Sequence, residues 1–167
     1  MSEKSRLAVN DGIARIDFDD GKANVMDTAM LSMLADHFDA AAGQAEVTVL
    51  TGRPGIFSAG FDLKTFQQGA EARNAMLEAG VQLILTMLLH PQPVLSVCTG
   101  HAYPMGAFLL MSSDVRLGLA GEYRLGMNEG AIGLTSPEFA LRLARYRRSG
   151  RGFEQITTST RYSPETA

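Results

Sequence analysis

Two segments of the sequence contain residue types that could bind a negatively charged oxygen through backbone N–H groups. They are Phe57–Lys64, which reads Phe-Ser-Ala-Gly-Phe-Asp-Leu-Lys, and Gly100–Ala107, which reads Gly-His-Ala-Tyr-Pro-Met-Gly-Ala. Each places small residues beside a predicted helix start, so free N–H groups from both could point at one oxygen. The pair predicts an oxyanion hole, in which each preorganised donor stabilises a developing charge, such as that of a thioester enolate, by roughly 3 kcal/mol.

The residues before each segment predict the scaffold that positions it. Residues 47–52 and 93–99 are short apolar runs of the kind found in buried parallel strands. Helical spacing predicts a helix over 28–42, capped by Asp27 and ended by Gly43, and a second over 70–89 that ends before Pro91. This alternation predicts an α/β fold, bordering on α+β, in which ligands collect at the carboxyl ends of the strands.

The remaining elements follow from turn and cap residues. Asp11-Gly12 between apolar runs predicts a hairpin of strands 7–10 and 13–18, and Pro104 suits the first turn of a helix. Further along, the sequence predicts short strands at 115–119 and 123–126, and a helix capped by Ser136 that continues through Arg148 and stops at Gly150. Another helix start is predicted at Ser163-Pro164-Glu165.

The composition excludes several classes of protein. A chain of 167 residues that is 46% hydrophobic can bury a core, and its length favours one domain spanning residues 1–167. The net charge of −3 offers no basic face for nucleic acid. The apolar runs are too short for a bilayer and no signal-peptide core is present, so we expect a cytoplasmic protein without a membrane partner. The lone Cys98 indicates a buried inert thiol, with no disulfide and no metal site.

The two loops, taken in order, resemble those of the crotonase, or enoyl-CoA hydratase/isomerase, family. The resemblance extends from the N-terminal hairpin and Lys22–Met26 to Met127–Leu134 and covers nearly all of the chain. It implies a spiral of ββα units in two nearly perpendicular sheets, surrounded by helices. Family members run considerably longer, so it also implies a core domain that lacks the C-terminal helices. If the full-length chain is present, a homotrimer or a dimer of trimers is expected.

The resemblance also implies roles for individual residues. The oxyanion donors are expected to be the backbone N–H groups of Phe61 and Met105. Glu129 matches one of the two catalytic glutamates of the family's hydratases, although a glutamate in a surface turn is the alternative reading. The second glutamate position is held by Phe108, which cannot move a proton. Contacts with coenzyme A are expected from Ala23, Asn24, Val25, Ser58, Ala59, Gly60, Asp62, Leu63, Lys64 and Gly106.

These assignments predict an enzyme of fatty acid metabolism that acts on acyl-CoA thioesters, as an enoyl-CoA isomerase or a weak hydratase. One glutamate would move the proton, and no cofactor is implied beyond the coenzyme A carried by the substrate. Two alternatives remain open. Phe108 and Pro104 are compatible with a degenerate, non-catalytic acyl-CoA binding or assembly subunit, and enolate chemistry of the same kind can also support CoA-thioester hydrolysis.

Overall fold

A computed structural model describes residues 4–166 and begins with an antiparallel hairpin. Strand β1 (Ser5–Asn10) pairs with β2 (Ile13–Phe18) around the Asp11-Gly12 turn, as predicted. The side chains of β2 alternate, with Ala14, Ile16 and Phe18 buried. This alternation sets one face of the sheet against the core.

Parallel strands extend the hairpin into a five-stranded sheet in the order β1-β2-β4-β7-β9. The added strands are β4 (Val47–Thr51), β7 (Val94–Cys98) and β9 (Val115–Gly118), each parallel to its neighbour. The predictions for 47–52, 93–99 and 115–119 are thereby confirmed within one or two residues. The carboxyl ends of β4 and β7 lead directly into the two loops singled out in the sequence.

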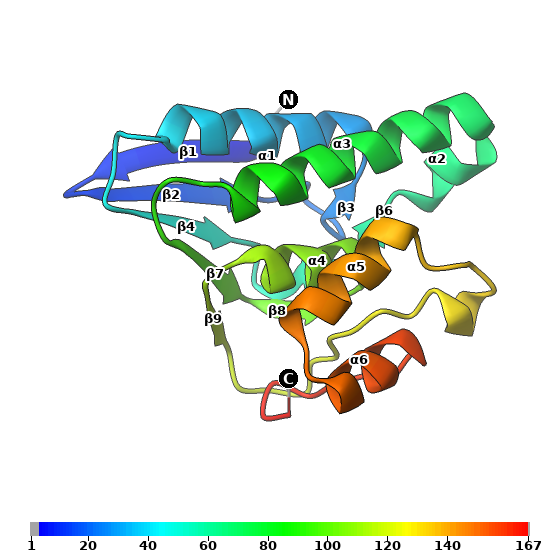
Figure 1. Cartoon of the computed structure of the whole chain (residues 1–167). Coiled ribbons are helices and arrows are strands. Elements are labelled where there is room, and N and C mark those ends of the chain that lie inside the picture. The colour runs from blue at the N-terminus through cyan, green and yellow to red at the C-terminus, as the bar shows by residue number, and fades with distance from the viewer. Residues whose placement is uncertain (1–3, 167) are drawn as a thin grey trace.

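Two long helices cover one face of this sheet (Figure 1). Helix α1 (Thr28–Ala41) begins at Asp27, whose side chain accepts a hydrogen bond from the Met30 N–H at 2.7 Å. Helix α3 (Ala70–Leu88) packs beside α1 and ends before Pro91. Both helices contribute to the hydrophobic core through Leu31, Leu34, Phe38, Leu83 and Met87. The predicted cap and stop residues of these helices are confirmed.

Short strands form a second layer that the sequence patterns did not indicate. Strand β5 (Gly55–Ser58) pairs with β8 (Gly100–Ala102), and β3 (Val25–Met26) pairs with β6 (Gly60–Phe61), both in parallel. Helix α2 (Leu63–Gln67) follows β6, and α4 (Pro104–Ser112) follows β8. Strands of two to four residues are too short to show periodicity in the sequence, so only long-range pairing reveals them.

The C-terminal third differs from the prediction at three places. Residues 123–126 form no strand, because only Leu125 makes bridges, to Ala102 and to Tyr162, and Gly126 has a φ of 151°. Helix α5 (Glu138–Arg147) is capped by Pro137 rather than Ser136, since Pro137 is extended and its carbonyl accepts the first helical bond from Ala140.

The third correction concerns Gly150, which was predicted to stop a helix. Gly150 does not end a helix but begins α6 (Gly150–Thr157), because the Ser149 side chain caps the Gly152 N–H at 3.2 Å. Residues 164–166 form a turn, closed by a hydrogen bond from the Thr166 N–H to the Ser163 carbonyl, so the helix start at Ser163-Pro164-Glu165 stays a prediction.

None of the helices between residues 4 and 166 combines the length and the hydropathy needed to cross a membrane.

Candidate active site

The two predicted oxyanion loops lie against each other. Ser58, in β5, pairs with Ala102 of β8, and its carbonyl accepts a hydrogen bond from the Tyr103 N–H at 2.9 Å. A Cβ atom added to Gly60 would stand 3.3 Å from Pro104, and one added to Gly106 would stand 2.9 Å from the Ser58 side chain. The loops therefore meet through backbone contacts that only small residues allow.

The backbone N–H of Met105 has no acceptor among the described residues. It occupies the second position of α4, where a helix offers no internal partner for an N–H. Tyr103, the residue before the helix, makes no side-chain cap. The Met105 N–H is thus a donor left available at the start of a helix.

The backbone N–H of Phe61 points away from the strand it pairs with. The next residue, Asp62, donates its N–H to the Met26 carbonyl of β3 at 3.2 Å. Consecutive N–H groups of an extended strand point to opposite sides, so the Phe61 N–H faces away from β3. The Phe61 ring packs against Gly80 of α3, where an added Cβ would lie 2.9 Å from it.

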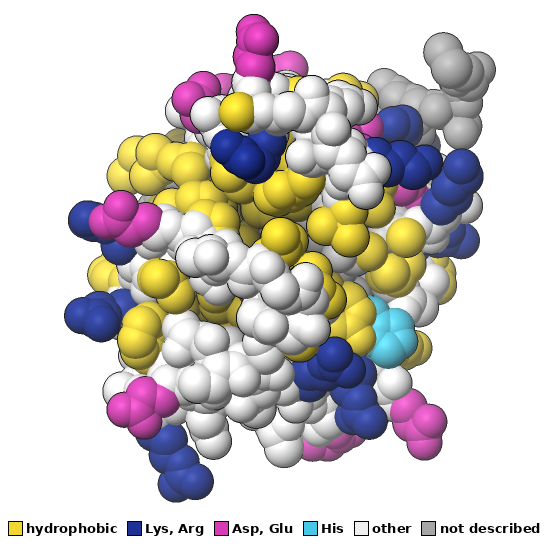
Figure 2. All heavy atoms as spheres, turned by 90° about the vertical axis from the view of Figure 1, so that its right-hand side faces the viewer, with side chains coloured by type: hydrophobic (Ala, Val, Ile, Leu, Met, Phe, Trp, Pro, Cys, Tyr) yellow, Lys and Arg dark blue, Asp and Glu magenta, His cyan; other side chains and the backbone are white. Residues whose placement is uncertain are grey.

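A cavity of about 530 Å³, here called the Glu129 cavity, opens beside these loops. Figure 2, which views the side of the molecule where α2 and the loop after Glu129 lie, shows hydrophobic side chains gathered in the middle of this face, with charged side chains toward its borders. The lining of the Glu129 cavity is mainly apolar. It consists of Ala59, Phe61, Leu63, Phe66, Arg73, Leu77, Tyr103, Pro104, Asn128, Glu129, Ile132, Leu134, Thr135, Ser136 and Pro137.

Glu129 contributes a buried carboxylate to this cavity. The residue is only 6% exposed, and neither of its carboxylate oxygens has a hydrogen-bond partner within residues 4–166. Burial raises the pKa of Glu129, because an apolar environment disfavours the charged form. Its own backbone N–H opposes this shift but does not reach hydrogen-bond geometry with either oxygen. Glu129 is therefore no exposed surface-turn glutamate.

A tight turn places the Glu129 side chain. The Glu129 carbonyl accepts N–H groups from Ile132 at 3.1 Å and from Leu134 at 2.9 Å, around a short 3₁₀ helix (Gly130–Ile132). Gly133, with a φ of 74°, closes the turn. Backbone groups of the same loop make these hydrogen bonds, and the Glu129 side chain does not cap the 3₁₀ helix. The carboxylate therefore faces the cavity.

Phe108, at the second glutamate position implied by the resemblance, lies outside the lining of the cavity. It is fully buried in α4 and packs edge to face on Phe139 of α5, with ring centroids 5.7 Å apart. Within the described residues, Glu129 is the only carboxylate that lines the Glu129 cavity.

Of the residues expected to contact coenzyme A, only Ala59 and Leu63 line the cavity. Asn24 is fully buried, and its side chain donates to the Phe18 and Phe57 carbonyls at 3.1 and 3.2 Å. Ser58 is also buried, and its hydroxyl donates to the Asn24 carbonyl at 2.7 Å. The Asp62 carboxylate caps α2 by accepting hydrogen bonds from the Lys64 backbone N–H and the Thr65 hydroxyl. The remaining residues, Ala23, Val25, Gly60, Lys64 and Gly106, lie outside the lining.

Several residues that line the cavity were not singled out from the sequence. Arg73 and Leu77 come from α3, and Tyr103 and Asn128 flank Pro104 and Glu129 in the chain. Tyr103 and Asn128 lie within the motifs 100–107 and 127–134 and could have been found there. Arg73 and Leu77 carry no local signal, because only packing brings α3 to the cavity.

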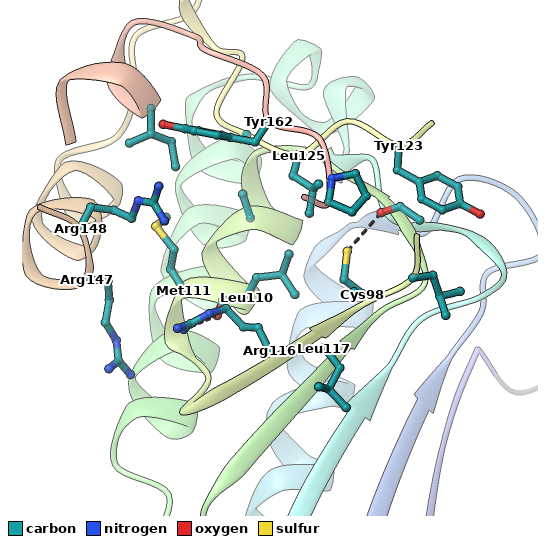
Figure 3. A pocket seen from close by; sticks show the side chains of 17 residues that line it. Cys98, Leu110, Met111, Arg116, Leu117, Tyr123, Leu125, Arg147, Arg148 and Tyr162 are labelled. Carbon is teal, nitrogen blue, oxygen red and sulfur yellow. Dashed lines mark hydrogen bonds between the residues drawn. The ribbon is translucent and has the colours of Figure 1, made fainter. Parts of the chain in front are cut away.

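A second cavity of about 270 Å³ lies between α4, β9 and the C-terminal residues (Figure 3). Cys98 lines it and donates its thiol to the Gly100 carbonyl at 3.1 Å, and burial raises the pKa of this thiol. These features agree with the prediction of an inert thiol. The two residues predicted to be oxyanion donors, Phe61 and Met105, do not line this second cavity, and neither does Glu129.

Comparison with known proteins identifies the family. Residues 8–167 match the family model for enoyl-CoA hydratase/isomerase. The chain therefore belongs to the enoyl-CoA hydratase/isomerase, or crotonase, family, and its fold is the crotonase fold.

Solved structures of the family are closely similar to the chain. An enoyl-CoA hydratase/isomerase family protein from Pseudomonas syringae is 34% identical, with a TM-score of 0.95, and the match covers 98% of this chain and 72% of that protein. An enoyl-CoA isomerase from Mycobacterium tuberculosis is 38% identical, with a TM-score of 0.93, and the match covers 100% of this chain and 74% of that one.

Curated relatives are longer. The peroxisomal fatty acid beta-oxidation multifunctional protein of Arabidopsis thaliana is 31% identical over 130 residues, which are 75% of this chain. The chain spans 18% of the length of that relative, and 32% of the mitochondrial enoyl-CoA hydratase domain-containing protein 3 of Homo sapiens, which is 29% identical over 98 residues.

Proposed function

We propose that the protein is an enoyl-CoA isomerase that moves a proton between two carbon atoms of an unsaturated acyl-CoA thioester, with hydration as a weaker activity. The observation that carries this proposal is the unpaired, buried carboxylate of Glu129, which shares a cavity with the two oxyanion loops. A raised pKa suits a group that must both take and return a proton near neutral pH.

In the proposed reaction, the N–H groups of Phe61 and Met105 bind the thioester oxygen. The Glu129 carboxylate removes a proton from the α carbon of a 3-enoyl thioester, and the electron pair moves into the carbonyl to form a dienolate. The two N–H groups stabilise the oxygen charge of this intermediate. The carboxyl group then returns the same proton to the γ carbon, which shifts the double bond to the 2-position and restores the carboxylate.

The position of Phe108 favours proton shuttling over hydration. Addition of water is easiest when two carboxylates hold and activate it, whereas the shuttle needs only one. The Phe108 ring packs against Phe139 in the core, and a phenylalanine has no polar group that could hold water in the cavity. The similar protein from Mycobacterium tuberculosis is described both as an enoyl-CoA isomerase and as a probable enoyl-CoA hydratase, so its description does not choose between the two reactions.

Binding of coenzyme A is assigned to the rim of the Glu129 cavity. Ala59 and Leu63 line the cavity and would contact the pantetheine arm, while Lys64, exposed at the start of α2, would meet a phosphate. Contacts from Ala23 and Val25, the trimeric assembly and the cytoplasmic location stay predictions.

The test compares turnover with binding. Isomerisation and hydration are measured with 3-enoyl and 2-enoyl-CoA esters of several chain lengths, and binding is followed by ligand-induced melting shifts. We expect Glu129→Gln to lower turnover by about 100-fold or more while binding persists. Glu122→Gln, at an exposed glutamate outside the cavity, is the matched control. Unchanged turnover of Glu129→Gln would refute the assigned role.

The same assays separate the alternatives. Binding of CoA esters without any turnover by the wild-type chain would favour a non-catalytic acyl-CoA subunit. Release of free coenzyme A, detected with a thiol reagent, would instead favour thioester hydrolysis.

A further inference from the structure

The second cavity, between α4, β9 and the C-terminal residues, has a concentration of positive charge in its walls. Arg116, Arg147 and Arg148 line it, and no aspartate or glutamate among the described residues does. None of the ion pairs found within residues 4–166 includes any of these three arginines. A guanidinium group stays charged at every physiological pH, so a cavity lined by three of them attracts an anion.

Three hydrogen-bond donors on residues that line this cavity are buried without a partner in the described part of the chain. They are Nε of Arg147, Nε of Arg148 and the hydroxyl group of Tyr162. Tyr162 is only 9% exposed, and the Arg148 guanidinium lies over its ring, 5.4 Å from the ring centroid. Buried polar atoms are usually paired, so these donors indicate a ligand that carries acceptor oxygens.

Hydrogen bonds outside the cavity hold two of the lining residues in place. The Tyr162 backbone donates to the Leu125 carbonyl at 2.8 Å and accepts from the Leu125 N–H at 2.9 Å. Arg116 donates from Nη1 to the Ser113 carbonyl, at the end of α4, at 3.0 Å. A guanidinium group has five N–H bonds, so this contact leaves Arg116 further donors for a ligand.

The rest of the lining is mostly apolar and includes Leu110, Met111, Leu117, Leu125 and Ile156. Figure 3 shows Arg147 and Arg148 on one side of the cavity, and Cys98 and Tyr123 on the opposite side. The volume of about 270 Å³ lies just below the range of roughly 300–1,000 Å³ that is typical of pockets for drug-sized ligands. The cavity therefore fits a small molecule with an anionic end and an apolar body.

We propose that the second cavity binds a medium-chain fatty carboxylate. The carboxylate group accepts hydrogen bonds from Arg148 and from the Tyr162 hydroxyl, with Arg147 adding positive charge, and the hydrocarbon chain lies on the apolar walls. Charge-assisted bonds of this kind are stronger than those between neutral groups, and a carboxylate offers two acceptor oxygens. The second cavity and the Glu129 cavity share no lining residue, so this inference does not rest on the proposed function.

Calorimetric titration with octanoate tests the site. We expect saturable binding to the wild-type chain, with octanol, which lacks the charge, binding about 10-fold more weakly or worse. Arg148→Met, which replaces the charged side chain by an apolar one, should raise the Kd for octanoate about 10- to 100-fold. Arg151→Met is the matched control, because Arg151 is an exposed arginine of α6 outside the cavity lining.

A conservative variant separates loss of binding from loss of folding. Tyr162→Phe removes only the unpaired hydroxyl group, so the melting temperature should not fall, while the Kd for octanoate should rise about 3- to 10-fold. Tyr146→Phe, at a residue of α5 that is 75% exposed, is its control.

The apolar part of the site is tested by chain length. Hexanoate should bind about 10- to 20-fold more weakly than octanoate, since each buried methylene group tightens binding about 4-fold. Equal affinities for the two acids would contradict burial of the chain in the cavity.

The proposal is overturned if octanoate shows no saturable binding, or if inorganic phosphate binds as tightly as octanoate. It is also overturned if folded Arg148→Met and Tyr162→Phe chains both keep the wild-type Kd, or if Glu129→Gln abolishes octanoate binding, because the acid would then occupy the other cavity. Failure of the proposed function appears differently, as wild-type turnover that survives Glu129→Gln.

Discussion

Gly60 and Pro104, one from each predicted oxyanion loop, lie so close that no side chain fits between them. A Cβ atom at Gly60 would lie 3.3 Å from both the Cδ and the backbone nitrogen of Pro104. Gly60 also has a φ of 95°, a conformation that side chains rarely adopt. Gly60 directly precedes Phe61, and Pro104 directly precedes Met105, so a side chain at position 60 would push apart the two segments that carry the predicted donors.

Replacing Gly60 by alanine should therefore damage both the fold and the reaction. We expect Gly60→Ala to destabilise the protein by about 1–3 kcal/mol through backbone strain. The loops should also separate, which lowers kcat about 10- to 100-fold. Thermal melting and turnover of 3-enoyl-CoA measure the two effects. Gly118→Ala is the control, since a Cβ there meets no atom within 4 Å. Wild-type kcat in Gly60→Ala would contradict the two-donor arrangement.

Asn24 is expected to act on stability rather than on substrate binding. Its side chain joins the Phe18 and Phe57 carbonyls from inside the core, so Asn24→Ala would leave both carbonyls without this donor. We predict a loss of about 1–3 kcal/mol in the free energy of unfolding, with little change in KM below the melting temperature. Urea unfolding and steady-state kinetics test this. A large rise in KM at unchanged stability would restore Asn24 as a direct contact.

A carboxylate introduced at position 108 should not create a hydratase. Phe108 is 0% exposed, and Phe108→Glu would place a charged group in the core without a partner. We expect a loss of about 3–5 kcal/mol or a failure to fold, whereas Phe108→Leu should cost less. Soluble yield and melting temperature provide the comparison. A folded Phe108→Glu protein with faster hydration would show that this position reaches the substrate.

The buried carboxylate of Glu129 should make stability depend on pH. Its pKa in the folded protein is raised above the ordinary value of 4.5, so the folded state retains the proton over a range where the unfolded chain loses it. Stability from this group is complete below pH 4.5 and is lost as pH rises through the folded pKa.

Glu129→Gln should accordingly be more stable than the wild type at pH 8, by about 1–3 kcal/mol, and equally stable at pH 4. Melting curves at the two pH values measure the difference. Turnover of the wild type should rise with pH over the same interval, because the base must be ionised. If Glu129→Gln and the wild type had equal melting temperatures at pH 8, the Glu129 carboxylate would be solvated or paired.

Local signals in the sequence determined much of this protein. The Asp11-Gly12 turn, the Asp27 cap and the apolar strands over 47–52 and 93–99 depend on neighbours within a few residues, and the structure confirms them. The two glycine-containing loops and the later glutamate, taken in order, were also enough to recognise the family. Each of these motifs is a continuous run of residues and can be read directly from the sequence.

The tertiary structure alone decided which residues share the site. The pairing of β5 with β8 brings Ser58 beside Ala102, and the packing of α3 adds Arg73 and Leu77 to the Glu129 cavity. Hydrogen bonds to the Phe18 and Phe57 carbonyls hold the Asn24 side chain in the core. These relations join residues tens of positions apart, and their energies come from burial and hydrogen bonds between segments, which no local pattern records.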